Sequence, residues 1–520
     1  MEYQPDFRKS ISVIHLVAIS FILVSAGPFG QEEAICSGGA KLTFIGTLCI
    51  PFIYSFPLVL MSSEQATKIS ACGGAIEWGR ILGKPMSWFN CYTRFIRSVF
   101  DNSLYPVMVC DYLKSIIPQL KKKVWRFLTV CLVNIFALLV NYFGLESVGW
   151  VSFFLMVVIL FPFLLFFIFA IPKISSKYVF ADYPSELGKP KISTMISTII
   201  WQCSGFDTLG ALSSEVKNSK VTFPLSMIIT IGLIILVYLL PTIAGVSIEP
   251  DLKEWGSGAF APVSKKLPHC SNGWLSIWIS ISGACSSLSL MNVALSCTGR
   301  ELYACGNIDA IPFSSFFSKL HNNFNGDKTP LISIIFMGLI TIPLSFFDFS
   351  KLVEWTGILT VIAQLIQVVV FIACRIPGYF DKIYPIFLKY NKSEDSPINN
   401  EDILQSSQDM SNSEYLIKGD ESSQQITEEE KSSYQIEEEN VSNNNISNNG
   451  FIVPGGVFGV ILIVVPITAI SIYLIIISGW FSILVSFGLI LCMFVLQGLY
   501  LFVQWSIGIL CKQRNIEKIN

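Results

Sequence analysis

The sequence predicts an all-α polytopic membrane protein with 12 transmembrane helices. Hydrophobic residues make up 52% of the 520 residues and charged residues only 14%, while 40 phenylalanines contribute to an aromatic content of 13%. This composition is typical of a chain that crosses a bilayer many times. Two apolar stretches are interrupted by small residues, around Gly27 and around Gly205, and a carboxylate follows each interruption. We therefore predict that helices 1 and 6 are broken.

Each predicted span is close to the roughly 20 residues that an α-helix needs to cross the hydrocarbon core. Arg8 and Lys9 precede the first span, but the apolar run continues past any cleavage-like site, so we expect this segment to be retained. The spans are expected at residues 11–38 (broken), 42–61, 88–112, 127–143, 149–171, 192–212 (broken), 223–244, 274–297, 331–347, 352–374, 453–477 and 480–508.

The first break is the tetrad Gly27-Pro28-Phe29-Gly30, and Gln31-Glu32-Glu33 follows at once. Glycine weakens a helix, and proline removes one backbone donor. Such a break is tolerated at membrane depth only where the free backbone groups face protein or a water-filled cavity. An ionised carboxylate there costs roughly 2.5–3.5 kcal/mol and needs a partner. The break therefore predicts a binding site that suits a cation.

The second break, Trp201 to Asp207, interrupts the sixth span. Spans one and six begin two successive halves of five spans, and because five is odd the halves run in opposite directions. Broken helices in corresponding positions of such halves indicate the central site of a secondary transporter. Glu32 and Glu33 would offset the positive end of the half-helix behind them, so the site should prefer amines to carboxylates.

The third span is too polar for a helix that faces lipid. Asp101 follows Arg97 by four residues, so the two can form a structural ion pair, or Asp101 can line the substrate path. Tyr105 and Trp201 can bind an ammonium group over their ring faces, or they can simply pack. Fourteen scattered cysteines and three histidines indicate neither a metal site nor histidine-based acid–base chemistry.

Two five-helix repeats, a hydrophilic loop and a final helix pair make up the predicted domain organisation. Residues 393–450 hold 14 acidic and 2 basic residues, a balance of −12 that leaves +10 on the remaining chain. This segment cannot bury a core and is expected to be disordered. The predicted boundaries are 1–10 (cytosolic N-terminus), 11–171 (first repeat), 172–380 (second repeat), 391–450 (acidic cytosolic loop), 451–510 (helices 11 and 12) and 511–520 (cytosolic C-terminus).

Twelve spans place both termini on the same side of the membrane. Basic residues near both ends favour the cytosol under the positive-inside rule, although residues 121–123, three lysines, would then lie outside. The acidic loop would be cytosolic in this topology. Its sequons at Asn391, Asn440 and Asn445 are therefore expected to carry no glycan.

Four stretches of this chain carry a family resemblance. Residues 27–33, 101–114 and 201–224 resemble the first-helix break, the third-helix signature and the sixth-helix motif of the polyamine uptake transporters of plants and protozoa, a branch of the amino acid–polyamine–organocation superfamily. Arg300-Glu301-Leu302 with Thr329-Pro330 is a weaker match, and the likeness spans roughly residues 8–380. The chain departs from the family at Gln367, where an acidic residue is expected.

The resemblance implies a five-plus-five inverted repeat with two extra helices and proton-coupled uptake of putrescine, spermidine or related amines at the plasma membrane. The partners would be a small cationic substrate, the proton and the lipid bilayer, with no cofactor, metal ion or nucleic acid. Glu32 or Asp207 would carry the proton. The candidate substrate-binding residues are Gly27, Phe29, Gly30, Glu32, Glu33, Asp101, Tyr105, Trp201, Ser204, Gly205, Phe206 and Asp207.

Two other functions stay open at this stage. Gln367 gives weight to an amino acid permease, for example one for cationic amino acids. A sensor that does not transport would signal through residues 393–450. An enzyme is not indicated, because no Ser/His/Asp, Cys/His or metal-binding pattern stands out.

Overall fold

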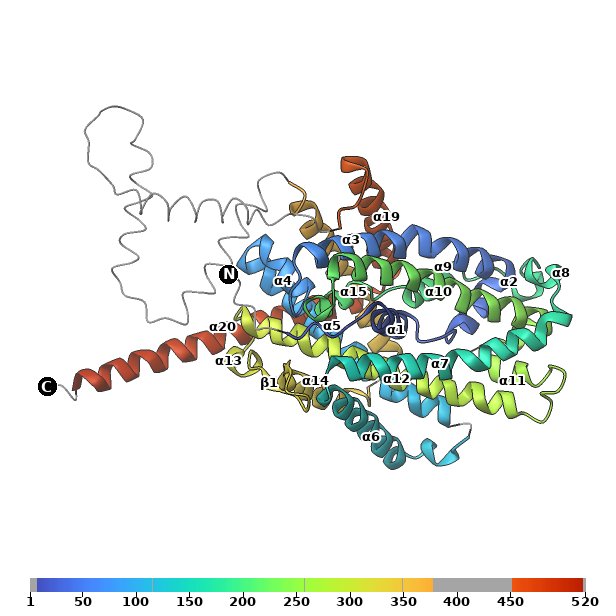
Figure 1. The fold of residues 1–520 in the computed structure, drawn as a ribbon, viewed down its shortest axis with the longest axis horizontal. Helices are drawn as coiled ribbons and strands as arrows, with labels where there is room; N and C mark the ends of the chain where they lie inside the picture. Colours follow the sequence, from blue (N-terminus) through green and yellow to red (C-terminus); the bar gives the residue numbers. More distant parts are fainter. Residues whose placement is uncertain (1–6, 115, 257, 348, 377–450, 518–520) are drawn as a thin grey trace, which may run out of the picture. The chain divides into compact units, whose positions relative to one another are not determined.

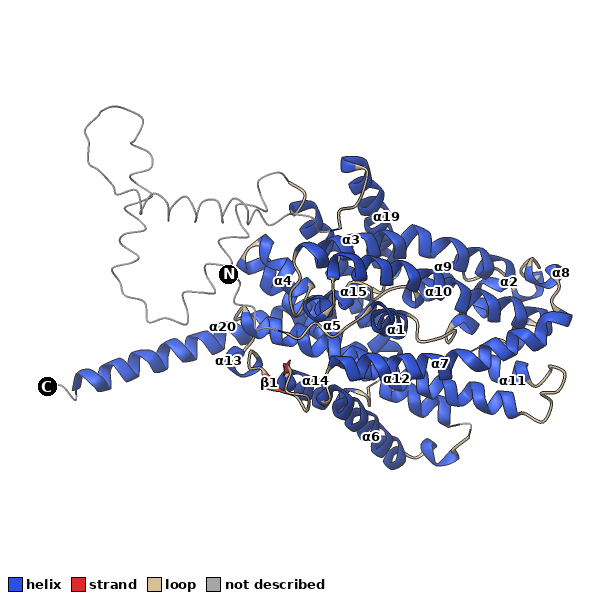
Figure 2. Ribbon diagram, viewed as in Figure 1, coloured by secondary structure: helices blue, strands red, loops and turns tan. Residues whose placement is uncertain are grey.

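The computed structural model describes residues 7–376, apart from 115, 257 and 348, and residues 451–517. The chain divides into two compact units, and all the helices discussed below belong to the one formed by Asp6–Ala373 and Phe451–Asn520. This unit is built almost entirely of helices (Figure 2). The predicted acidic loop at 391–450, with its sequons, lies outside the described residues.

Among the described residues, this unit contains thirteen longer helices (Figure 1). They are α1 (Val13–Val24), α2 (Gln31–Ile50), α3 (Phe56–Lys68), α5 (Lys84–Leu113), α6 (Lys123–Tyr142), α7 (Leu145–Ala170), α9 (Ile192–Gln202), α10 (Ser219–Ile248), α12 (Trp274–Asn307), α14 (Leu331–Leu344), α15 (Phe349–Ala373), α19 (Gly456–Ile477) and α20 (Trp480–Glu517).

Short elements connect the long helices. The short α-helices and the one strand pair are α4 (Ala75–Gly79), α8 (Ser176–Val179), α11 (Phe260–Ser264), α13 (Ser314–Phe317) and antiparallel β1 (His321–Asn322) with β2 (Lys328–Thr329). The 3₁₀ turns are Arg80–Leu82, Pro118–Lys121, Ile171–Lys173, Ser185–Leu187, Thr208–Glu215 and Leu252–Glu254, and one π-helical turn is Pro51–Ser55.

Eight helical segments of the described residues are long and apolar enough to cross a membrane, so the protein is an integral membrane protein. One of them, Gln31–Lys68, continues from the first break through the predicted second span. A kink at Gly39 (φ 78°, ψ 169°) divides it close to the predicted boundary. The shorter α1 and α14 are also apolar. The membrane class is confirmed. Most helices lie within a few residues of the predicted spans, but α12 ends at Asn307, well beyond the predicted residue 297, and the predicted second span is divided among α2, the π-helical turn and α3.

The polar third span becomes α5, a central helix that is shielded from lipid. It contacts α12, α15, α14 and α6, while α12 also contacts α7. Most of the α5 side chains from Asn90 to Cys110 are buried, including Arg94, Tyr92 and Asn102. This position explains how a helix with two arginines and two aspartates is accommodated, because its polar groups meet protein partners instead of hydrocarbon.

Both predicted breaks are present. Between α1 and α2 the chain passes through left-handed backbone at Gly27 (φ 113°) and Gly30 (φ 88°), a conformation that glycine adopts at little cost. Between α9 and the 3₁₀ turn Thr208–Glu215, Gly205 (φ 110°) plays the same part. The two broken segments therefore expose non-helical backbone inside the helical unit.

The chain that enters α1 is tied to the chain that leaves the second break. The N–H groups of Ser10 and Ile11 donate to the carbonyl oxygen of Glu215 (3.0 and 3.1 Å), and Lys217 N–H donates to the carbonyl of Ile11 (2.9 Å). The Glu215 carboxylate pairs with buried Arg300 of α12 (2.6 Å). These contacts link the segment before α1 and the segment after the second break to α12.

Close packing at the second break predicts a stability difference between two glycine variants. A Cβ at Gly210 would lie 2.3 Å from the ring of buried Trp78, so Gly210→Ala should destabilise the protein by about 1–3 kcal/mol. Gly232, in α10, has no neighbouring atom within 4 Å of such a Cβ, and Gly232→Ala should be neutral or stabilising. Thermal unfolding in detergent measures both. Equal melting temperatures would contradict the packing at Gly210.

Candidate functional site

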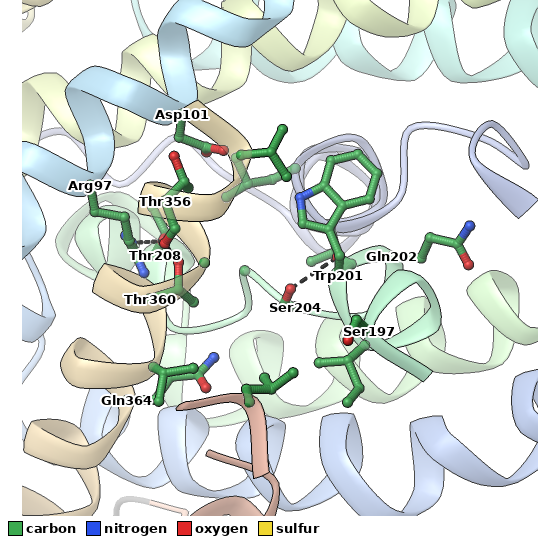
Figure 3. A pocket seen from close by; sticks show the side chains of 18 of the residues that line it. Arg97, Asp101, Ser197, Trp201, Gln202, Ser204, Thr208, Thr356, Thr360 and Gln364 are labelled. Atoms are coloured by element: carbon green, nitrogen blue, oxygen red, sulfur yellow. Dashed lines mark hydrogen bonds between the residues drawn. The ribbon is translucent and has the colours of Figure 1, made fainter. Parts of the chain in front are cut away.

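A cavity of about 530 Å³ lies against the second break. Its walls come from the end of α1, the π-helical turn, α5, α9 with its break, α12, α15 and the end of α19. Figure 3 shows Asp101 of α5 and Thr356 of α15 facing one space, with Trp201 of α9 on the other side. The volume falls within the range of small-molecule sites.

The structure separates the predicted site residues into two groups. Those that line the cavity are Asp101, Tyr105, Trp201, Ser204 and Gly205. Those that belong to the breaks but lie outside its lining are Gly27, Phe29, Gly30, Glu32, Glu33, Phe206 and Asp207. The first break is nevertheless near, because a Cβ at Gly30 would lie 3.3 Å from Gln202 Nε2 and 3.7 Å from the Trp201 ring.

Asp101 does not pair with Arg97, although the sequence spacing allows it. Tyr105 donates its hydroxyl to Asp101 Oδ2 at 2.5 Å, one helical turn away. In the part of the chain that the structure describes, Asp101 forms no ion pair. Its carboxylate thus lines the cavity with only a neutral partner.

Arg97 pairs with Asp207 instead. Asp207 Oδ2 lies 3.0 Å from Arg97 and 3.0 Å from Arg94, and all three side chains are buried. Arg97 also donates to Thr208 Oγ1 (2.6 Å), a contact that Figure 3 draws as a dashed line. Two guanidinium groups from α5 therefore hold the carboxylate of the second break, and the charge of the cavity-lining Arg97 is compensated.

The same network of hydrogen bonds and ion pairs extends to α12 and α15. Arg94 lies 3.4 Å from Glu301 Oε1, and Ser98 donates to Glu301 Oε2 (3.1 Å). Arg94 also donates to Gln367 Oε1 (3.4 Å), and the Gln367 amide donates to Gln65 Oε1 (2.8 Å). Gln367 lies outside the cavity lining. The neutral side chain at this position therefore removes no charge from the cavity wall.

Most backbone donors of the first break are already used by the chain itself. The two residues before Gly27 donate their N–H groups to one carbonyl in the last turn of α1 (2.9 Å each). Gly27 N–H donates to Ser25 Oγ (3.4 Å), Pro28 has no N–H, and Gly30 N–H donates to Glu32 Oε2 (2.8 Å). The Glu32 carboxylate occupies a position at the start of α2 that could otherwise attract an anion.

Glu32 and Glu33 face different surroundings. Glu32 is 1% exposed and, among the described residues, forms no ion pair, whereas Glu33 is exposed. Phe29 packs between Tyr112 and Phe163, with ring centroids 5.0 and 5.3 Å away. These aromatic contacts anchor the first break against α5 and α7.

Sequence reasoning missed the cavity face of α15. The residues of this face that line the cavity are Val353, Glu354, Thr356, Gly357, Thr360, Val361 and Gln364. Polar residues at positions 356, 360 and 364 recur every four residues in an otherwise apolar helix, a pattern that indicates a polar stripe. Gln364 exchanges hydrogen bonds with Tyr54 of the π-helical turn (2.9 Å). In the described residues no three metal-ligating side chains converge on a metal site.

A helical membrane unit with a cavity beside a broken helix, and a second break near it, is typical of a membrane transporter. The amino acid permease family matches residues 10–381, so this chain belongs to that family and is a transporter, not an enzyme. It is 30% identical over 375 residues to polyamine transporter PUT1 of Oryza sativa subsp. japonica, covering 72% of this chain and 68% of the relative. For polyamine transporter RMV1 of Arabidopsis thaliana the identity is 28% over 370 residues, covering 71% and 73%. The family resemblance predicted from the motifs is confirmed.

The buried network predicts that substitutions of two aspartates destabilise the protein by different amounts. Asp207→Asn leaves two buried arginines without their shared counter-charge and should cost about 3–5 kcal/mol of stability. Asp101→Asn keeps an acceptor for Tyr105 and should cost about 1 kcal/mol or less. Unfolding in detergent, followed for both purified variants, tests the difference. Equal loss in the two would mean that Asp207 has no special structural role.

Proposed function

We propose that the protein imports polyamines of the putrescine and spermidine class by alternating access. The observation that carries this proposal is the charge of the cavity wall. Asp101 lines the cavity with only a tyrosine hydroxyl as its partner, while Asp207 compensates Arg97. The uncompensated charge is therefore negative, which favours a cationic substrate. PUT1 and RMV1 are named as polyamine transporters, which agrees with such a substrate.

The first break supports an amine over an amino acid. Its N–H groups at Gly27 and Gly30 donate to Ser25 and Glu32, and position 28 is a proline. A substrate carboxylate would have to displace these internal partners to reach the backbone donors. An amine without a carboxylate avoids this cost.

Trp201 and Tyr105 supply the aromatic walls in this proposal. Trp201 is 41% exposed and lines the cavity, so its ring face is accessible to a ligand. An ammonium group over such a face gains about 0.5–2 kcal/mol, and methylene groups between ammoniums gain from contact with the ring edge. A linear polyamine contains both kinds of group.

We assign the coupling proton to Glu32 and not to Asp207. Both were candidates from sequence, but Asp207 is held by two arginines, which stabilise its ionised form. Glu32 is buried and forms no ion pair in the described ranges, so an unprotonated Glu32 would be costly in this conformation. A group that loses its proton when its surroundings change is suited to couple a proton gradient to transport.

The proposal includes the predicted topology. The two breaks lie near the starts of the segments 11–171 and 172–380, the arrangement expected for two inverted five-helix repeats followed by helices 11 and 12. We place both termini in the cytosol, in keeping with the basic residues near the chain ends. We place the protein in the plasma membrane, as uptake of an external substrate requires.

A permease for cationic amino acids is the second candidate, because the family is described as one of amino acid permeases. Matched substrates separate the two functions. Ornithine is putrescine with an added carboxylate, and arginine is agmatine with one.

Uptake into a transport-deficient host should therefore favour the decarboxylated member of each pair. We expect ornithine and arginine to compete at least about tenfold less well than putrescine and agmatine, equivalent to about 1.4 kcal/mol. Competition measured at fixed labelled putrescine tests this. Uptake of ornithine that ignores putrescine would overturn the polyamine assignment.

Glu32→Gln should separate substrate exchange from proton-driven accumulation. In liposomes, the variant should exchange internal for external putrescine. It should no longer concentrate putrescine in response to an inward proton gradient, because the amide cannot take up and release a proton as a carboxylate does. The exposed neighbour provides a matched control, Glu33→Gln, which should accumulate putrescine as the wild type does. Gradient-driven accumulation by Glu32→Gln would assign the proton elsewhere.

A further inference from the structure

Glu354 is a second carboxylate on the wall of the same cavity. It lies near the start of α15, on the face that also presents Gly357, Val361 and Gln364 to the cavity. Its side chain is exposed, and it forms no ion pair within the part of the chain that the structure covers. A Cβ at Gly479 would lie 3.2 Å from its Oε1, so Glu354 stands beside the turn that joins α19 and α20.

The position of Glu354 along α15 separates it from the other end of the cavity. Gln364 follows Glu354 by ten positions, which corresponds to about 15 Å of helix at 1.5 Å per residue. Both residues line the cavity, so the cavity is elongated along α15. An elongated site suits a linear ligand better than a compact one.

Unpartnered polar groups on the same wall point independently to a ligand. Thr356 is 6% exposed and lines the cavity, yet its hydroxyl has no hydrogen-bond partner in the described residues. Neither amide atom of Gln202, which is 1% exposed and also lines the cavity, has a partner there. Buried polar groups are normally hydrogen-bonded, so these atoms are available to a polar ligand.

We propose that Glu354 forms a second anionic subsite, which together with Asp101 selects linear amines that carry two or more ammonium groups. One ammonium group binds near Asp101 and Tyr105, the methylene chain passes Thr356, and another ammonium group reaches Glu354. This inference rests on the proposed amine transport and adds a requirement to it, because Asp101 alone would accept a monoamine equally well.

The test compares a dication with a monocation of the same chain length. Purified full-length protein in liposomes takes up labelled spermidine, and putrescine and butylamine serve as competitors. In Glu354→Gln the inhibition constant of putrescine should rise at least about fivefold, a modest cost for one charge–charge contact. That of butylamine should change less than twofold. Glu354→Asp, which keeps the charge on a shorter side chain, should lie between the wild type and Glu354→Gln.

A control variant removes a carboxylate outside the cavity. Glu254 is exposed in the turn before α11 and does not line the cavity, so Glu254→Gln should leave both constants unchanged. Equal changes for putrescine and butylamine, or no change for either, would overturn the second subsite. A wild-type protein that takes up and binds no amine would instead refute the proposed function, so the two failures are distinguishable.

Discussion

The shared salt bridge of Asp207 with Arg94 and Arg97 is the interaction on which the rest of the site depends. Charged groups inside a membrane protein need partners, because neither hydrocarbon nor a dry interior solvates them. Here the partners come from different elements, α5 and the second break, and Glu301 of α12 completes the balance. The non-helical backbone after α9 is thereby held against the central helix. Because the charges of both arginines are compensated there, the sign of the charge on the cavity wall depends on other residues.

The two breaks use the same backbone chemistry for different purposes. Gly27 and Gly30 at the first break and Gly205 at the second have positive φ, and an acidic residue follows each break. At the second break Asp207 neutralises arginines, and the flanking Trp201 and Ser204 line the cavity. At the first break Glu32 satisfies a backbone donor of its own segment and stays unpaired with any cation among the described residues. We therefore assign recognition of the substrate mainly to the second break and the proton to the first.

Several features follow from local sequence because their causes are local. Span positions depend on runs of apolar residues, and the helices observed lie close to the ranges predicted for them. Proline and glycine at 27–30 and glycine at 205 weaken a helix wherever it lies, so both breaks are visible before any folding is considered. The family motifs are local as well, and the match to residues 10–381 agrees with them.

The ion-pair partners of charged side chains do not follow from local sequence, and only the tertiary structure determined them. Spacing allowed Arg97 to pair with Asp101, but the fold brings Asp207, more than one hundred positions later in the sequence, within 3.0 Å of the same guanidinium. Glu354 could be assigned to the cavity only after α15 was packed beside α5, because the polar stripe at 356, 360 and 364 indicates a polar face of α15 but not what that face meets. By itself, the sequence determined the membrane class, the breaks and the family. Which carboxylates are neutralised and which remain for a ligand depends on contacts between distant segments, since charge compensation acts through space.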